Sequence, residues 1–224
     1  MVFDPMEFLY TATTWVIPLI LAIVLHEIAH GYMAYKLGDT TAKRLGRLSL
    51  NPQKHIDPIG SLLVPGILLV MKSPVLIGWA KPVPVDYRNL KNPKRDMGLV
   101  AAAGPVSNFI IAILLVILAR IVFPFLPAGG NFSNWVFANF QNGVMLSVTL
   151  GVFNLLPILP LDGGRILVSL LPTKYSIEYQ KTEQYGFYIL MALIFIGPML
   201  KIDIIRWYFD TVMPYVLYVL NLFA

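Results

Sequence analysis

The sequence has no cysteine and little charge. Only 13% of its 224 residues are Asp, Glu, Lys or Arg, whereas about a quarter of a soluble domain is charged. With 57% hydrophobic residues and a mean hydropathy of +0.70, the chain cannot cover itself with a polar surface, so we expect lipid to surround most of it. The absence of cysteine excludes a disulfide framework and a Cys-ligated zinc site, and leaves the compartment open.

Two further classes are disfavoured. The net charge of +5 could suggest nucleic acid, but the basic residues lie in loops, as they do on the cytoplasmic side of membrane proteins. We therefore expect no nucleic-acid partner. The first ten residues have no basic region and no small-residue cleavage site, which argues against a removable signal peptide.

Long apolar runs organise the chain. Residues 8–35, 97–122 and 143–171 are predicted to form a three-helix core, and 185–200 and 204–223 to form two C-terminal transmembrane helices. The predicted fold is an all-α polytopic membrane protein. Residues 1–224 form a single membrane domain, with the core at about 8–171 and the C-terminal helices at about 185–223.

The charge distribution predicts orientation. Eleven of the 17 lysines and arginines lie between residues 36 and 95, and none lies in 123–142. The positive-inside rule then places the first region in the cytoplasm and 123–142, read as a loop, outside. If the apolar residues 59–79 crossed the membrane, the basic stretch 81–96 would fall outside. We interpret 59–79 as a re-entrant or short inserted segment; an ordinary short spanning helix is the alternative.

The most informative motif closes the first apolar run: His26-Glu27-Ile28-Ala29-His30. On a helix, H-E-x-x-H places two imidazoles one turn apart on the same face, where they can bind zinc. Glu27 can then act as the general base on a zinc-bound water. Alternatively, Glu27 only orients a histidine.

A catalytic zinc usually takes three protein ligands, and Asp162 is the best third candidate. It lies late in an inward-running segment, as the two histidines do, so the three fall at similar depth. An unpaired carboxylate there would cost at least about 2.5 kcal/mol. Gly163 and Gly164 leave room for a close approach. The alternative is an ion pair between Asp162 and Arg165 on the helix surface.

Three other polar residues are candidates of lesser weight. Asn154 shares a segment with Asp162, and the prolines between them break the helix, so Asn154 could bind a substrate strand or a developing oxyanion; helix packing is the alternative. His55 could line the site, polarise a carbonyl or be a fourth ligand, although loop histidines are more often structural. Asn108, in Ala103-Gly104-Pro105-x-x-Asn108, is interpreted as structural, beside small residues that favour close helix packing.

Together these motifs resemble the site-2 protease family of intramembrane zinc metalloproteases. The matching pieces are His26–His30 and Asn154-Leu155-Leu156-Pro157-Ile158-Leu159-Pro160-Leu161-Asp162-Gly163-Gly164-Arg165, together with residues 51–60, 78–85 and 103–108. The latter three resemble a compact prokaryotic branch without PDZ or CBS domains.

The resemblance implies one Zn²⁺ per chain, bound by His26, His30 and Asp162, with Glu27 activating water and Asn154 assisting substrate or transition-state binding. The reaction would be peptide-bond hydrolysis in or near transmembrane segments of membrane proteins. The enzyme would be a multi-pass protein of the cell membrane, with its active site near the cytoplasmic side.

Two alternatives use the same side chains. A zinc-binding transporter would need no glutamate beside its first ligand and would be expected to show repeat symmetry, of which the sequence has no sign. A non-catalytic scaffold would keep zinc as a structural pin, and its Glu27 could be replaced silently. Neither the substrate nor the oligomeric state follows from the sequence.

Overall fold

The computed structural model describes residues 4–71 and 78–223, and these ranges contain helices and loops but no strand. The long helices are α1 (Pro5–Lys36), α4 (Pro93–Val122), α5 (Asn131–Asn154) and α10 (Ile204–Asn221). The short α-helices are α2 (Thr41–Arg44), α3 (Val64–Val70), α6 (Asp162–Leu170), α7 (Thr173–Gln180), α8 (Glu183–Met191) and α9 (Gly197–Met199). Single turns of 3₁₀ or π type are η1 (Pro52–His55), η2 (Pro58–Leu63), η3 (Tyr87–Asn89), η4 (Phe123–Phe125) and η5 (Ala192–Ile196).

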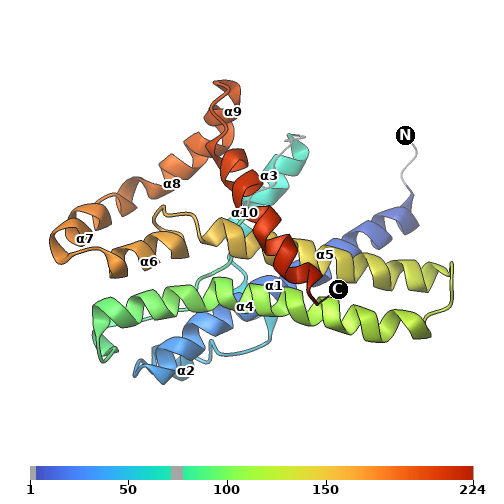
Figure 1. Cartoon of the computed structure of the whole chain (residues 1–224), viewed down its shortest axis with the longest axis horizontal. Coiled ribbons are helices and arrows are strands. Elements are labelled where there is room, and N and C mark those ends of the chain that lie inside the picture. Colours follow the sequence, from blue (N-terminus) through green and yellow to red (C-terminus); the bar gives the residue numbers. More distant parts are fainter. Residues whose placement is uncertain (1–3, 72–77, 224) are drawn as a thin grey trace.

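Helices α1, α4 and α5 lie side by side and form the core of the molecule (Figure 1). Small residues line their contacts: Ala22 of α1 and Ala112 of α4 are buried, and Gly151 of α5 packs against Phe109 and Asn108. Small side chains let helix backbones approach closely, which is how helices associate in lipid. The three-helix core predicted from the sequence is thus present.

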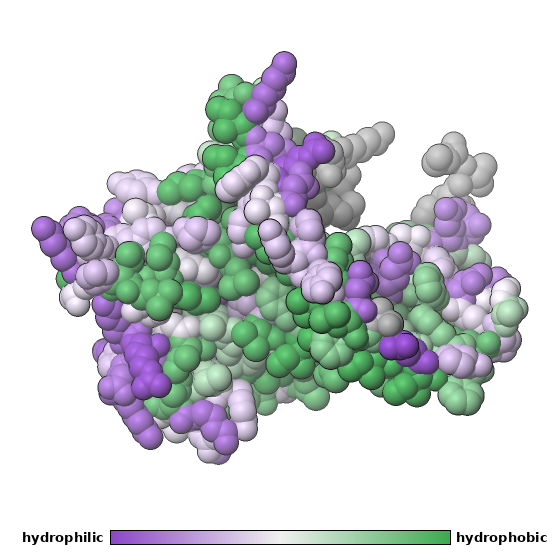
Figure 2. Space-filling model, in the orientation of Figure 1, coloured by the Kyte–Doolittle hydropathy of each residue, from purple (hydrophilic) through white to green (hydrophobic). Residues whose placement is uncertain are grey.

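The outer surface of this core is apolar. Helices α1, α4 (extended through η4 to Phe125) and α5 are each long and apolar enough to cross a membrane. Hydrophobic residues cover the middle of the bundle, and hydrophilic residues gather at the end that carries α2 and the start of α4 (Figure 2). This confirms the predicted all-α polytopic class, since such a surface is solvated by lipid rather than water.

One predicted boundary is wrong, and one predicted break is confirmed. Residues 131–142, predicted as part of an outside loop, form the first half of α5, because an uncharged stretch with Phe, Trp and Val can continue a membrane helix. The predicted break within 143–171 is present, since α5 ends at Asn154 and α6 begins at Asp162. Pro157 and Pro160 account for the break, because proline removes a backbone donor and clashes with the preceding turn.

The segment 59–79 returns to its starting point. The backbone N–H of Trp79 donates to the Gly60 carbonyl at 3.1 Å, and the Ser61 hydroxyl donates to the Trp79 carbonyl at 2.8 Å. A segment that crossed a membrane would separate its ends by about 30 Å. The meeting of these ends therefore favours the re-entrant interpretation, although residues 72–77 lie outside the described ranges.

The two predicted C-terminal helices form a bent pair. Residues 183–199 and α10 meet at 96°, and only together are they long and apolar enough to span a membrane, as one broken span or a re-entrant loop. The bend follows Pro198 and contains Lys201 and Asp203, which interrupt the apolar run. In Figure 1, α10 runs back across the core helices.

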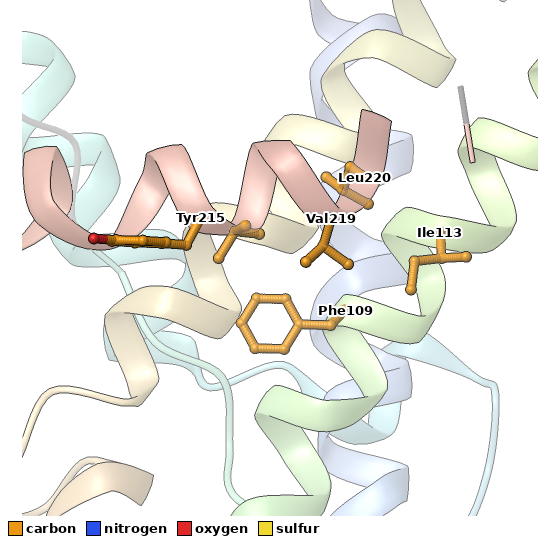
Figure 3. A pocket seen from close by; sticks show the side chains of 6 residues that line it. Phe109, Ile113, Tyr215, Val219 and Leu220 are labelled. Carbon is orange, nitrogen blue, oxygen red and sulfur yellow. The ribbon is translucent and has the colours of Figure 1, made fainter. Parts of the chain in front are cut away.

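Helix α10 leaves a groove of about 280 Å³ against α4, lined by Phe109, Ile113, Tyr215, Val216, Val219 and Leu220 (Figure 3). Beneath it, Leu220 packs on Ala112, Val148 and Val152. The lining is hydrocarbon apart from one phenol. The groove therefore suits apolar chains and carries none of the titratable groups expected of the active site.

The buried carboxylate of Asp39 links several elements at the polar end of the molecule by hydrogen bonds. Asp39 is fully buried just after α1; its Oδ1 accepts bonds from the Thr41 N–H, the Thr41 hydroxyl and the Asn89 amide, and its Oδ2 accepts one from the Asp86 N–H. Burial by itself would raise the pKa of Asp39, but these hydrogen bonds outweigh it, and the pKa lies below its ordinary value. Asp39 thereby joins α1, α2 and η3.

We expect Asp39→Ala to lower the free energy of unfolding by about 3 kcal/mol, because four donors lose a charged acceptor. Since the folded-state pKa is depressed, the contribution of Asp39 is complete above the unfolded pKa and is lost as the pH falls through the folded one. Thermal unfolding in detergent should therefore show a lower unfolding temperature for the variant than for wild type at pH 7, and this difference should shrink as the pH is lowered. A difference in unfolding temperature that stays the same between pH 7 and pH 3 would contradict this account.

Candidate metal centre

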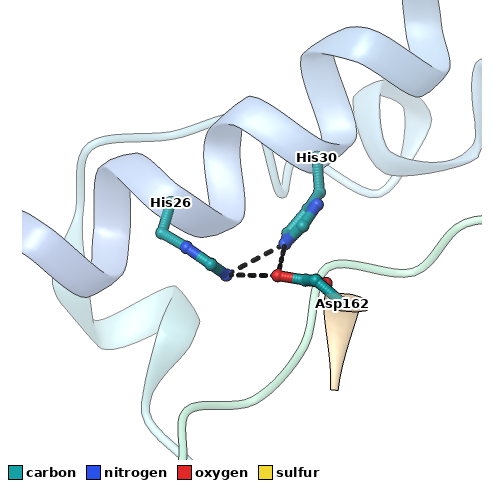
Figure 4. Close-up of side chains that lie close together, drawn as sticks. All are labelled: His26, His30 and Asp162. Carbon is teal, nitrogen blue, oxygen red and sulfur yellow. Dashed lines mark hydrogen bonds and ion pairs between the residues drawn. The ribbon is translucent and has the colours of Figure 1, made fainter. Parts of the chain in front are cut away.

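Three side chains converge where α1 meets the start of α6. The Nε2 atoms of His26 and His30 are 3.0 Å apart, and Asp162 Oδ2 lies 3.2 and 3.3 Å from them (Figure 4). All three are largely buried. Among the described residues, they are the only group of three or more His, Asp or Glu side chains close enough to hold a metal ion.

The donor set fits zinc. Two imidazole nitrogens and one carboxylate oxygen are a ligand set of catalytic zinc sites, and ligands about 2.0–2.2 Å from a tetrahedral ion lie roughly 3.3–3.6 Å apart. The observed separations are close to this range. Asp162 Oδ2 is buried with no hydrogen-bond donor, so a cation at the centre of the three atoms would satisfy it.

His30 is oriented by the next helix. Its Nδ1 lies 2.7 Å from the carbonyl of Val100 on α4, which can only accept, so Nδ1 carries the proton. In neutral His30 the lone pair is then on Nε2, the atom that faces Asp162. A carbonyl one helix away thus selects the tautomer that binds metal.

Gly104 of α4 makes room for both imidazoles. A Cβ on Gly104 would lie 2.4 Å from His30 Nε2 and 2.6 Å from His26 Cε1. The predicted close packing at Ala103-Gly104-Pro105 is therefore real, and its partner is the ligand pair itself.

Asp162 is available because Arg165 is engaged elsewhere. The Arg165 guanidinium pairs with Glu183 of α8 at 2.9 Å and donates to the Tyr87 hydroxyl at 3.0 Å. The alternative ion pair between Asp162 and Arg165 is absent from the described residues. Gly163 lets the first turn of α6 pack on the residues after α5, since a Cβ there would lie 2.2 Å from the Leu155 carbonyl oxygen.

Glu27 is held beside this centre by the segment 78–85. The backbone N–H of Val83 donates to Glu27 Oε2 at 2.8 Å. Val83 is buried against α1 at Gly31, where a Cβ would lie 2.7 Å from the Val83 side chain. The two glycines Gly31 and Gly104 therefore let other chain segments reach the motif from two sides.

The segment 78–85 is itself anchored. Arg47 Nη2 donates to the carbonyls of Lys81 and Pro82 at 2.9 and 3.2 Å. The Lys81 N–H donates to the carbonyl of His55, and the buried ring of His55 bonds through Nε2 to the Ser49 carbonyl. The structure thus places His55 as an anchor of this segment and not in the group of converging ligands.

Asn154 is the last residue of α5, before the break that leads to Asp162. Its Nδ2 donates to the Leu150 carbonyl of its own helix at 3.0 Å. Because an amide NH₂ carries two hydrogens, one N–H and the carbonyl oxygen are left to interact with another molecule, so Asn154 can accept from a substrate N–H or donate to an oxyanion.

The sequence missed several groups that the fold brings to the centre. The Val100 carbonyl and the Val83 N–H are backbone groups and give no residue-type signal. Gly104 was noted only for helix packing, and Arg165 was considered as a partner of Asp162. Only the presence of residues 78–85 among the family motifs could have pointed to that segment.

Comparison with known proteins agrees with these motifs. Residues 124–197, which contain Asn154 and Asp162, match the model of peptidase family M50. "Putative zinc metalloprotease YwhC" of Bacillus subtilis is 43% identical over 82% of this chain and 80% of its own. "Putative zinc metalloprotease Rip2" of Mycolicibacterium smegmatis is 31% identical over 85% of this chain and 71% of its own. No solved structure matches the chain.

The sequence similarity spans most of the chain, and the apolar helices and the His/Asp group fit the same assignment. The expected zinc cofactor and metallopeptidase activity follow from it, and the transporter and scaffold alternatives are set aside. The chain belongs to peptidase family M50, the site-2 protease family, and is a multi-pass membrane zinc metallopeptidase.

Proposed function

We propose that this enzyme hydrolyses peptide bonds in or near the transmembrane segments of membrane proteins, with His26, His30 and Asp162 holding zinc and Glu27 as general base. The observation that carries the proposal is the convergence of the three ligand atoms within 3.3 Å at one end of a bundle of membrane-length helices. A peptide bond reaches that centre most directly from lipid or from the membrane surface.

The residues divide the chemical work. Zinc, when bound, supplies a Lewis acid that polarises the scissile carbonyl and lowers the pKa of water. Glu27 Oε2 is held by the Val83 N–H, so Oε1 is the oxygen that accepts the proton of the attacking water and passes it to the leaving amine. The Val100 carbonyl holds His30 in the tautomer that leaves Nε2 unprotonated.

Asn154 is proposed to bind substrate backbone through its carbonyl oxygen and its remaining amide N–H, because the bond to Leu150 uses only one of the two amide hydrogens. A helix satisfies its own backbone groups, so a substrate helix must unwind before it can donate an N–H to Asn154. His55 is proposed to act through the segment 78–85 that it anchors.

The active site is proposed to lie near the cytoplasmic side of the cell membrane. The support is that eleven of 17 basic residues fall between residues 36 and 95 and that α2, η1 and Val83, all from this region, contact α1. Lys94, before the apolar part of α4, donates to the Leu171 carbonyl after α6, so these loops share one end of the bundle. Hydrolysis needs water, which that polar end can supply.

Glu27→Gln should abolish cleavage and leave zinc in place. We expect kcat to fall about 10²–10⁴-fold, the usual contribution of a general base, because glutamine keeps the hydrogen bond to Val83 and cannot accept a proton. Purified protein in detergent would be given a single-span membrane peptide, with the products mapped by mass spectrometry and zinc measured on both proteins. Full activity in the variant would remove Glu27 from the mechanism, and cleavage only far from the span would refute the intramembrane substrate.

Gly104→Ala should weaken zinc binding at least about tenfold, or roughly 1.4 kcal/mol, because the added methyl would overlap both imidazoles. The matched control is Gly66→Ala in α3, where an added Cβ meets nothing within 4 Å among the residues that the structure describes. Competition with a chromogenic chelator measures the affinity. Equal affinities for the two variants would show that Gly104 is not needed for ligand placement.

Arg47→Ala should lower kcat about 10–100-fold at unchanged zinc content. Its guanidinium holds the segment 78–85, and displacement of a positioned catalytic group by about 1 Å can have an effect of this size. The control is Arg44→Ala, an exposed arginine of α2. If the two variants cleave the peptide equally well, the segment does not position Glu27.

A further inference from the structure

The two histidine ligands are supported unequally. His30 gives its second ring nitrogen to the Val100 carbonyl. His26 is 5% exposed, and its Nδ1 is buried without a hydrogen-bond partner among the described residues. Metal-binding histidines almost always donate their other N–H to a carboxylate, carbonyl or water. The Nδ1–H of His26 therefore needs a hydrogen-bond acceptor.

A second buried group has the same need. Asn108 of α4 is fully buried, and within the described part of the chain neither its Nδ2 nor its Oδ1 has a hydrogen-bond partner. Its Cβ packs against Gly151 of α5, so the amide lies inside the three-helix core. An unpaired amide in such a place costs about 1–3 kcal/mol, which a purely structural residue such as leucine would avoid.

The helix register places the two groups on packed faces of α1 and α4. Helices α1 and α4 are antiparallel, with Val100 at His30 and Gly104 against both histidines. Asn108 follows Gly104 by one turn of α4. Because the helices are antiparallel, this direction along α4 is the direction from His26 towards the N-terminus of α1. The edge of His26 that contains Cε1 faces Gly104, and Nδ1 is the neighbour of Cε1 in the ring, on the side of the Cβ. Residues four positions apart share a face of a helix, so Asn108 lies on the face of α4 that Gly104 turns towards the two histidines.

We propose that Asn108 is a positioning residue for the zinc site: its amide oxygen receives the Nδ1–H of His26 when the metal is bound, through a side-chain rotation or one bridging water. The proposal rests on the assignment of His26 as a zinc ligand. The bond would fix the tautomer that leaves Nε2 free for zinc, as the Val100 carbonyl does for His30. It gives two buried, unpaired atoms a partner, His26 Nδ1 and Asn108 Oδ1. It also accounts for the presence of an asparagine within an apolar bundle.

The test separates this role from a structural one. Asn108→Leu keeps the volume and removes both polar atoms, and Asn108→Asp keeps an acceptor. Asn139→Leu is the matched control, since Asn139 is a half-buried amide of α5 bonded to Trp135. Each protein in detergent is titrated with zinc against a chromogenic chelator, its Co²⁺ form is examined by visible absorption, and its thermal unfolding is recorded without metal.

We expect Asn108→Leu to lose zinc affinity about 10–100-fold and to change the Co²⁺ spectrum, with metal-free thermal stability equal to or above that of wild type. Asn108→Asp should stay within about threefold of wild type, and Asn139→Leu should be unchanged. Zinc affinity retained in Asn108→Leu, or lost equally in the leucine and aspartate variants, would overturn the proposal. A wild type that binds no zinc in the same titration would instead refute the proposed site, and this inference with it.

Discussion

The structure depends on the burial of a polar centre inside a bundle whose outer surface is apolar. Lipid cannot hydrogen bond, so each polar group at that depth must find its partner within the protein. His30 hydrogen bonds to the Val100 carbonyl, Glu27 accepts a hydrogen bond from the Val83 N–H, and Asp162 faces the two imidazoles. The position of α4, the path of the segment 78–85 and the break before α6 all follow from this requirement.

Glycines allow the backbone segments that contact this polar centre to come close to it. Gly104 lets α4 lie on the ligand pair, Gly31 lets Val83 pack on α1, and Gly163 lets the first turn of α6 pack on the end of α5. In a membrane protein such contacts also hold the helices together, because there is little hydrophobic driving force between helices in lipid. The same glycines therefore serve both the packing of the bundle and the geometry of the candidate metal centre.

Much of the fold could be predicted because its signals are local. Hydropathy located the three core helices, and charge asymmetry suggested that 59–79 does not cross, in agreement with the contact between Gly60 and Trp79. The start of α5 at Asn131 was missed, because an uncharged stretch is equally compatible with a loop and a helix. The bend between α9 and α10 was missed as well, since hydropathy reports length and apolarity but not direction.

The sequence alone predicted the chemistry, since two histidines and a glutamate at helical spacing, with a distant aspartate in a family motif, indicate a zinc metallopeptidase. Only the tertiary structure decided which groups support them. It paired Arg165 with Glu183 in place of Asp162, directed the His30 N–H to Val100, and buried His26 Nδ1 and the Asn108 amide without a partner among the described residues. The physical reason is that side-chain identity sets what a residue can do, whereas hydrogen bonding to backbone groups and clearance at glycine depend on how helices pack.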